Sequence, residues 1–264
     1  MAPQVTDFRE KYRPKKFSDV IGNKQLIQFL KNTIVTGQIL NLLFNGEAGT
    51  GKTSLAYVYA KALCCENFDG DLCDECEPCK SIEAALPNDC AIYGLHIHNC
   101  AMMDENRVDE KFRNCLYYIN FNAFRRDIHI WDEFHRIRGR SQDKFLKPLE
   151  SNSRVLFIFC LIDLASLEPA FLQRVQILKT KRPEIAELIL WLHHICEIEG
   201  IAVEDRQSLI FLAQSAERTP RECLRLLQAA SLYGEPLTNE LLREVLENSK
   251  SVKADRPKYT IIAV

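Results

Sequence analysis

The sequence predicts an α/β protein, in which a parallel sheet is flanked by helices and followed by a small all-helical domain. Short, almost wholly apolar runs are typical of buried parallel strands; they occur at residues 39–44, 128–131 and 155–162. Helical periodicity lies before and between them, at 23–35, 54–63 and 142–150. Because strands alternate with helices, we expect a doubly wound parallel sheet.

The pattern of predicted elements changes after residue 182. Four segments with helical patterns follow without an intervening strand, at 183–200, 204–216, 220–234 and 239–248. We therefore expect a nucleotide-binding domain over residues 1–180, a helical lid domain over 181–248 and a tail over 249–264.

Composition narrows the class of protein. The chain has 264 residues, 47% of them apolar, and a net charge of −2, which is ordinary for a globular protein. No apolar run approaches the ~20 residues that span a bilayer, and the N-terminus lacks the apolar core of a signal peptide. We expect a cytoplasmic protein that does not bind a membrane. The near-neutral charge gives no overall footprint for nucleic acid, so DNA binding would come from local patches or several subunits together.

A phosphate-binding loop follows the first apolar run. The segment GEAGTGKT matches G-x-x-x-x-G-K-[ST], and it stands between a predicted strand and a predicted helix, as the motif requires. Backbone N–H groups of such a loop surround phosphate at a helix N-terminus. Lys52 would reach the β- and γ-phosphates and Thr53 would hold Mg²⁺. The predicted ATP-binding residues here are Gly46, Glu47, Ala48, Gly49, Thr50, Gly51, Lys52, Thr53 and Ser54.

An acidic pair ends the second apolar run. In IHIWDEFH, Asp132 and Glu133 come at the carboxyl end of a strand, where ligands of α/β sheets bind. Asp132 would hold Mg²⁺ and Glu133 would orient or deprotonate the attacking water. By itself such a pair could equally cap the next helix, but together with the upstream loop the catalytic interpretation is favoured.

Eleven cysteines are many for an intracellular chain, and closely spaced cysteines in a reducing compartment are more often metal ligands than disulfides. Cys73, Cys76 and Cys79 form C-x-x-C-x-x-C, and Cys64 or Cys65 can supply a fourth thiolate. We prefer Cys65, which lies farther along the helix towards the other three. Four thiolates predict a closed, structural Zn²⁺ site; the alternative is a set of free thiols in a loop.

These features together resemble one family. The entry KYRPKKFSDVIG, the phosphate loop, the cysteine cluster after its helix and the segments DEFHRI and KFLKPLE are similar to the ATPase core of bacterial DNA polymerase III clamp-loader subunits of the gamma/tau type, within the AAA+ superfamily. The resemblance runs from about residue 8 to residue 247. It implies ATP, Mg²⁺ and Zn²⁺ as cofactors, and other clamp-loader subunits, a sliding clamp and primer–template DNA as partners.

The resemblance also assigns roles to residues outside the motifs. Arg174 would act in trans as an arginine finger on ATP bound by a neighbouring subunit. Arg221 would read the γ-phosphate in cis from the lid. Without the resemblance, either arginine alone would be assigned to a surface ion pair. An adenine pocket would be lined by Tyr12, Arg13, Pro14 and Ile21.

The chain departs from the family pattern in four places. The family has a polar residue near the end of the 155–162 strand to position water, and this chain has Leu161 and Ile162, which leaves slow or absent hydrolysis as an alternative. The finger motif keeps only its arginine, as QRV. The Cys65–Cys73 spacing is one residue shorter than expected. The family continues into a helical collar, so either a truncated chain or a different assembly would explain the printed sequence.

Four functions compete at this point. The first is an ATP-driven replication motor subunit that loads a sliding clamp. The second is a nucleotide-binding scaffold that turns over little ATP, and the third is the same module reused in a mobile element or defence system. The fourth, a stand-alone zinc nucleic-acid binder, is disfavoured because little basic charge surrounds the cysteines. His96, His98 and His129 lie on or near predicted strands and carry no spacing signal.

Overall fold

The computed structural model describes residues 7–84, 94–117, 127–151 and 154–254. The described residues form two compact units, one built on residues 13–182 and the other on residues 7–12 together with 183–254. The division falls two residues after the predicted domain boundary. Residues 7–12 group with the helices, whereas the sequence placed them with the sheet.

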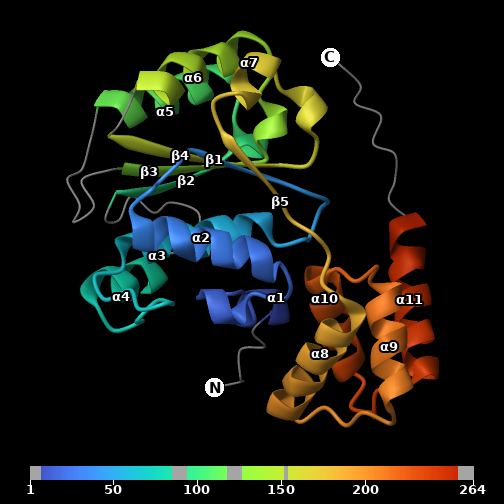
Figure 1. The fold of residues 1–264 in the computed structure, drawn as a ribbon. Coiled ribbons are helices and arrows are strands. Elements are labelled where there is room, and N and C mark those ends of the chain that lie inside the picture. Colours follow the sequence, from blue (N-terminus) through green and yellow to red (C-terminus); the bar gives the residue numbers. More distant parts are fainter. Residues whose placement is uncertain (1–6, 85–93, 118–126, 152–153, 255–264) are drawn as a thin grey trace. The chain divides into compact units, whose positions relative to one another are not determined.

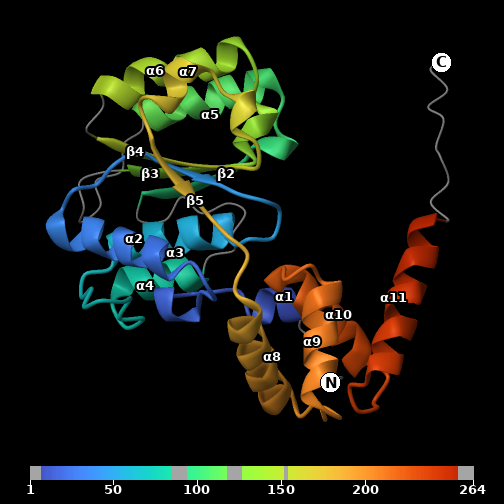
Figure 2. The same ribbon diagram turned by 45° about the vertical axis from the view of Figure 1, so that its right-hand side comes forward.

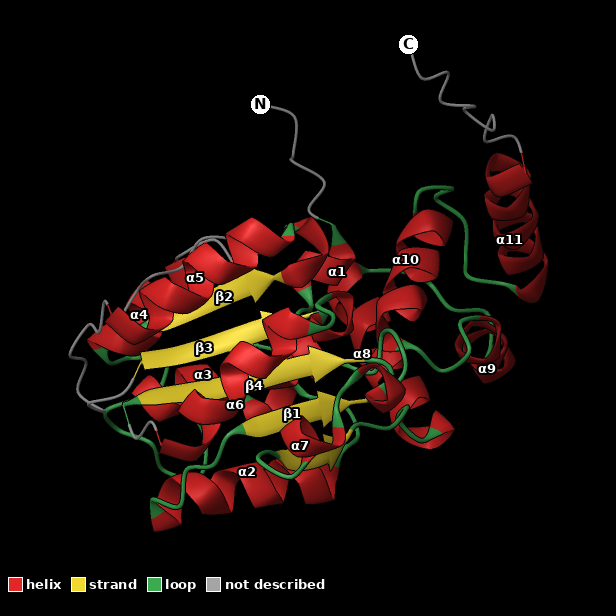
Figure 3. Cartoon of the chain, turned by 90° about the horizontal axis from the view of Figure 1, so that it is seen from above, coloured by secondary structure: helices red, strands yellow, loops and turns green. Residues whose placement is uncertain are grey.

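The first unit, called the sheet unit below, contains a five-stranded parallel sheet in the order β2-β3-β4-β1-β5. The three predicted strands are β1 (Leu42–Asn45), β3 (Asp127–Asp132) and β4 (Val155–Leu161). Two strands were not predicted: β2 (Leu95–Asn99) forms one edge of the sheet and β5 (Gln176–Lys179) forms the other. Figure 3 looks onto this sheet, with β2 at its edge.

Helices cover both faces of the sheet (Figures 1 and 2). One face carries α2 (Lys24–Thr36), α3 (Lys52–Cys64) and α4 (Glu77–Ala84), and the opposite face carries α5 (Glu105–Tyr117), α6 (Arg140–Ser151) and α7 (Pro169–Leu172). Helices α2, α3 and α6 agree with the predicted helical segments, whereas α4, α5 and α7 were not predicted.

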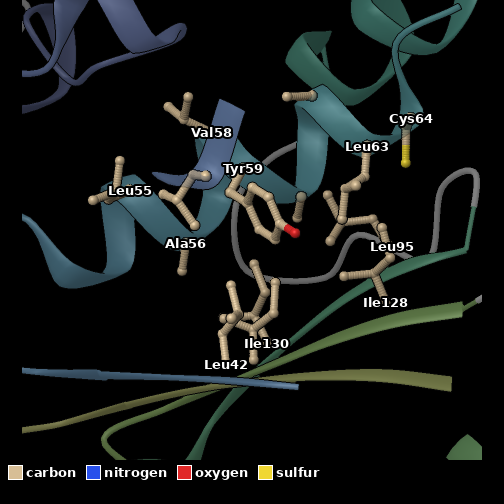
Figure 4. Close-up of a cluster of buried hydrophobic side chains, with 14 of the residues drawn as sticks. Leu42, Leu55, Ala56, Val58, Tyr59, Leu63, Cys64, Leu95, Ile128 and Ile130 are labelled. Atoms are coloured by element: carbon tan, nitrogen blue, oxygen red, sulfur yellow. The ribbon is translucent and has the colours of Figure 1, made fainter. Parts of the chain in front are cut away.

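The two faces hold separate cores because strand side chains alternate in direction. Under α3, the core is mainly aliphatic, with Leu55, Tyr59 and Leu63 of the helix over Leu42 and Ile130 of the sheet (Figure 4). Under α5 and α6, the core is aromatic: the rings belong to Phe112, Trp131, Phe134, Phe145, Phe157, Phe159 and Phe171. Because of this alternation, each strand residue contributes its side chain either to the core under α3 or to the core under α5 and α6.

The second unit, called the helical unit, contains α1 (Phe8–Lys11), α8 (Ile185–Glu199), α9 (Arg206–Ser215), α10 (Pro220–Ser231) and α11 (Asn239–Ala254). Gly200 ends α8 in the left-handed region (φ 67°), and the side chain of Asp205 caps α9 by accepting from the N–H of Ser208 at 2.9 Å. Helix α11 extends to Ala254, so residues 249–254 of the predicted tail are helical and residues 255–264 lie outside the described residues.

Candidate nucleotide site and cysteine cluster

The phosphate loop connects β1 to α3 and is shaped by two glycines. A Cβ on Gly46 would lie 2.2 Å from Oγ1 of Thr180 and 2.7 Å from its carbonyl oxygen, so only glycine fits there. Gly51 precedes α3 with φ at +86°, which a larger residue adopts only with strain. Helix α3 then begins at Lys52, and the first N–H groups of a helix have no partner within the helix and are available to an anion.

The side chain of Lys52 is folded into the loop. Its Nζ donates to the carbonyl oxygens of Gly46 at 2.7 Å and Glu47 at 2.6 Å, and only 8% of the residue is exposed. Burial lowers the pKa of Lys52, while the nearby acidic side chains of Asp132 and Glu133 oppose this shift. A phosphate in the loop offers a better partner for this ammonium group than the two carbonyl groups do.

Thr53 and Asp132 are brought together from α3 and the end of β3. The Thr53 hydroxyl donates to Oδ2 of Asp132 at 2.9 Å, and the backbone N–H of Glu133 donates to Oδ1 at 2.9 Å. Burial raises the pKa of Asp132 despite these two hydrogen bonds. Glu133 itself has a left-handed backbone (φ 53°), which turns the chain away after the strand. A hydroxyl beside a half-buried carboxylate is a donor set that suits Mg²⁺.

Two residues that the sequence analysis missed close the far side of the loop. Oγ1 of Thr180 lies 2.8 Å from Oγ1 of Thr50, and the Arg182 side chain pairs with Glu47. Both follow β5, a four-residue strand with three exposed side chains and therefore no apolar run to reveal it. Of the remaining loop residues, Ala48 is exposed, and Gly49 and Ser54 are half-buried.

The end of β4 lies directly beside the phosphate loop, where the N–H of Gly46 donates to the carbonyl of Leu161 at 3.4 Å. The Leu161 side chain is fully buried in the aromatic core under α5 and α6. Cys160 points to the opposite face, beneath α3. By alternation, Ile162 shares the face of Cys160, and its side chain is 47% exposed. Of the two apolar residues in the family's polar position, we therefore expect Ile162, and not Leu161, to face the nucleotide side.

The predicted cysteine cluster assembles between α3 and α4. The Sγ atoms of Cys65, Cys73, Cys76 and Cys79 all lie within 4.8 Å of one another, and those of Cys65 and Cys73 are 3.5 Å apart. Tetrahedral Zn²⁺ with four thiolates separates its sulfur atoms by about 3.8 Å. Cys64 is not part of this group; it is buried in the core under α3 (Figure 4).

The electrostatics of the cluster differ among its thiols. Burial opposes ionisation of Cys73, but hydrogen bonds from the backbone N–H groups of Cys76 and Glu75 outweigh it and lower the pKa of this thiol to about 6, which favours a thiolate at neutral pH. Burial raises the pKa of Cys65 and Cys79. An ion would have to displace the protons of these two thiols.

The cluster is tied to the rest of the sheet unit by charged groups. Lys61 of α3 is 1% exposed, and its Nζ donates to Oε2 of Glu83 at 3.0 Å and to Oδ1 of Asp74 at 3.2 Å. Asp71 accepts from the N–H groups of Phe17 and Ser18, both at 2.9 Å. The cysteine loop is therefore connected to α3, α4 and the entry segment.

The predicted adenine-pocket residues divide between the units. Arg13, Pro14 and Ile21 belong to the sheet unit and are half-buried. Tyr12 belongs to the helical unit, where its hydroxyl donates to Glu199. Arg221 is exposed in the first turn of α10, also in the helical unit.

Arg174 follows α7, and its side chain contacts residues of α6 and α7 in the same chain. Its Nε donates to Oε1 of Glu150 at 2.8 Å, and its Nη1 donates to the carbonyl of Ala170. Its side chain is 25% exposed. The structure thus brings the loop, Thr53, Asp132 and Glu133 together, whereas Arg174 makes its contacts to α6 and α7.

Comparison of the sequence with protein-family models shows the family to which the chain belongs. The family model described as DNA polymerase III, delta subunit, matches residues 22–184. The chain belongs to this DNA polymerase III family. The DNA polymerase III subunit gamma/tau of Mycoplasma pneumoniae is 32% identical over 88% of the chain, and the subunit tau of Escherichia coli is 30% identical over 85%. The chain spans about a third of the length of these relatives (33% and 34%).

The fold is confirmed by solved structures. The RuvB Holliday junction branch migration motor of Thermotoga maritima superimposes with a TM-score of 0.65 at 16% identity, over 90% of this chain and 72% of that one. The sheet unit therefore has the AAA+ fold, as predicted. The predicted resemblance to DNA polymerase III subunits is confirmed as well. Among the described residues, no helix is long and apolar enough to span a bilayer.

Proposed function

We propose that this chain is an ATP-binding AAA+ subunit of a clamp-loader-like assembly, which couples ATP to loading a sliding clamp onto primer–template DNA. The observation that carries the proposal is the hydrogen bond from Thr53 to Asp132, because it joins the phosphate loop to the acidic strand end in one site. Family membership supports the replication setting.

In this proposal each residue has a defined task. Lys52 exchanges the carbonyl groups of Gly46 and Glu47 for the β- and γ-phosphates of ATP. Thr53 and Asp132 hold Mg²⁺, which neutralises charge on the phosphates when it is bound. Glu133 orients the attacking water from its position beside Asp132. The exposed Ile162 offers no polar atom to assist, so we expect slow turnover in the isolated chain.

Arg174 would complete the site of a neighbouring subunit. For this it must leave Glu150, and an anionic γ-phosphate competes for the guanidinium with this partly exposed carboxylate. We propose Arg221 as the residue that reads the γ-phosphate in cis from the helical unit, since it stands exposed at the start of α10. We further propose that Tyr12, Arg13, Pro14 and Ile21 hold the adenine.

The cysteine cluster is proposed as a structural Zn²⁺ site. The support is the convergence of four Sγ atoms within 4.8 Å, with Cys65 as the fourth ligand. All four positions are supplied by protein, so the ion would brace the loop between α3 and α4 without catalysing a reaction.

A nucleotide-dependent scaffold that hardly hydrolyses ATP is the second candidate. It is favoured by one observation, the apolar end of β4 at Leu161 and Ile162. In that case the chain would bind ATP and donate Arg174 to partners, while turnover occurred elsewhere in the assembly.

A mixing experiment distinguishes the two candidates. ATP turnover with Mg²⁺ and primer–template DNA is measured for Lys52→Ala, for Arg174→Ala and for their mixture, with the exposed Arg113→Ala as the control arginine. If Arg174 acts in trans, each variant alone is inactive and the mixture recovers part of the wild-type rate, because one variant supplies the finger and the other the intact loop. Tight ATP binding by the wild type without turnover in any mixture contradicts the motor and supports the scaffold.

A further inference from the structure

A second group of metal-binding side chains lies on the opposite face of the sheet from the cysteine cluster. His98 of β2, His129 of β3 and Cys115 of α5, called the core triad below, are all buried. Nε2 of His98 lies 2.9 Å from Nδ1 of His129, and Sγ of Cys115 lies 3.0 Å from that same Nδ1 and 3.9 Å from Nε2 of His98. Three donor atoms from three elements thus converge on one point.

Strand register brings the triad together. In the parallel pairing of β2 with β3, His96 is opposite His129 and His98 is opposite Trp131. All four side chains point to the same face, where the rings of His96 and His129 stack at 4.3 Å and His98 packs on Trp131 at 4.3 Å. Helix α5 covers this face and contributes Cys115.

The two imidazoles of the triad are neutral, whereas burial raises the pKa of the Cys115 thiol to about 12, so an ion would have to displace its proton. Burial lowers the pKa of His98 to about 3 and holds that of His129 well below its usual value. Both imidazoles are therefore neutral, and each keeps a nitrogen lone pair. Neutral imidazole is the commonest metal ligand among protein side chains.

We propose that His98, Cys115 and His129 form a second metal site, which binds Zn²⁺ through two imidazole nitrogens and one thiolate. A tetrahedral ion separates two nitrogen ligands by about 3.4 Å and a nitrogen from a sulfur by about 3.6 Å. The observed separations of 2.9, 3.0 and 3.9 Å reach these values through shifts of about half an ångström. Three protein ligands leave one of the four positions of Zn²⁺ for a further ligand.

The charges around the triad balance such an ion. Binding releases the thiol proton of Cys115 to solvent, and the resulting thiolate cancels one of the two positive charges. The carboxylate of Asp127 is fully buried, and one of its oxygens lies within 4.8 Å of ring nitrogens of His96 and His129. Asp127 can therefore compensate the second charge, which a buried ion requires.

The donor atoms of the triad make their contacts mainly with one another, and Sγ of Cys115 also donates to the carbonyl of Lys111 at 3.0 Å. An ion would replace these contacts with three metal–ligand bonds. An ion bound by the triad would also link α5 to the edge strand β2 and its neighbour β3.

The proposal is tested by the zinc content of the full chain, equilibrated with Zn²⁺ and freed of excess metal. Cys115→Ser should contain one equivalent of zinc less than the wild type, whereas Cys100→Ser, which removes another buried thiol of the same unit, should contain as much as the wild type. Cys76→Ser, in the cysteine cluster, should lose its own equivalent and keep that of the triad. Equal zinc content in Cys115→Ser and the wild type overturns the proposal.

A measurement on the wild type covers the case in which Cys115→Ser does not fold. X-ray absorption at the zinc edge should show imidazole nitrogen at about 2.0–2.1 Å in addition to sulfur at about 2.3 Å. A zinc shell of sulfur alone would mean that the triad is only a hydrogen-bonded part of the core. Neither zinc measurement depends on ATP, so the second metal site is tested independently of the proposed ATPase function.

Discussion

The ends of β3 and β4 lie side by side at the same edge of the sheet, yet they differ in chemistry. β3 ends in Asp132 and Glu133, and Asp132 is joined to the phosphate loop through Thr53. β4 touches the same loop through the Leu161 carbonyl, but its side chains there are apolar. In the proposed site, the residues that would hold phosphate and metal are thus all present and Glu133 would orient water, whereas the end of β4 adds no polar group.

This difference separates binding from turnover. In the proposed site, Lys52, Thr53 and Asp132 would hold ATP and Mg²⁺, and the structure brings these three residues together. Accelerating attack on the γ-phosphate additionally requires oriented polar groups around the water. We therefore expect changes at β3 and the loop to reduce ATP binding or turnover, and a polar residue in place of Ile162 to raise turnover.

The largest effect is expected for Glu133→Gln. Loss of the group that orients or deprotonates water should reduce ATP turnover by about 100-fold or more, since general base catalysis typically contributes 10²–10⁴-fold. ATP affinity should stay near that of the wild type. Single-turnover hydrolysis and equilibrium binding measure the two quantities, and a rate equal to that of the wild type would remove Glu133 from the mechanism.

Lys52→Ala should weaken ATP binding by about 10- to 100-fold, because a charge-assisted hydrogen bond contributes about 1.5–3 kcal/mol. Titration with a fluorescent ATP analogue gives the affinity. Lys61 is buried, so Lys61→Ala is not a suitable control. Lys80 is exposed, and Lys80→Ala should bind the ATP analogue with the affinity of the wild type. Unchanged affinity in Lys52→Ala would show that the loop does not bind phosphate.

Ile162→Thr should raise turnover by roughly 10-fold, since it restores one hydroxyl on the nucleotide side of β4 and a single well-placed donor is worth at least that. Leu161→Thr is the matched control one residue away. Its side chain is in the aromatic core, so it should reduce thermal stability without raising the rate. If Leu161→Thr accelerates turnover and Ile162→Thr does not, the assignment of faces at the end of β4 is wrong.

The smallest effect is expected for Glu83→Gln, which leaves Asp74 as the one carboxylate paired with buried Lys61 and should reduce the free energy of unfolding by about 1 kcal/mol at pH 7. Burial alone would raise the pKa of Glu83, but Lys15 and Lys61 lower it below 4.5. A lowered folded pKa stabilises the protein above the unfolded pKa, and this stabilisation is lost as pH falls through the folded one.

The difference between Glu83→Gln and the wild type should therefore shrink below about pH 4.5. Denaturant unfolding at several pH values measures it, with Glu110→Gln, an exposed glutamate of α5, as the control. ATP affinity should not change in either variant. A difference that persists at pH 3 would mean that Glu83 stabilises the protein by packing and not by its charge.

The features that could be predicted from the sequence are those formed by residues close together along the chain. The phosphate loop and C-x-x-C-x-x-C reveal themselves by short spacings, and three of the five strands reveal themselves as apolar runs. Strand β2 was not predicted because two of its five residues are histidines, and β5 was not predicted because it is short and mostly exposed. Choosing Cys65 over Cys64 rested on helix direction, and the four Sγ positions agree with that choice.

The rest depends on strand register and could not be predicted. Thr180 reaches Thr50 only because β5 pairs with β1, and the register itself requires knowing that β5 exists. The core triad is similar: Cys115 and His129 meet His98 across two strands and a helix, with no spacing signal. Whether Leu161 or Ile162 faces the nucleotide likewise follows from the two cores, which the sequence alone does not separate.

The most direct test of the account is Mg²⁺-dependent ATP binding by the full wild-type chain, with conversion of the bound ATP to ADP followed in the same sample. The account predicts about one ATP bound per chain, slow conversion without partners, and faster conversion when Ile162 is replaced by threonine. A chain that binds no ATP in the presence of Mg²⁺ would contradict it, because the contact between Thr53 and Asp132 would then not belong to a nucleotide site.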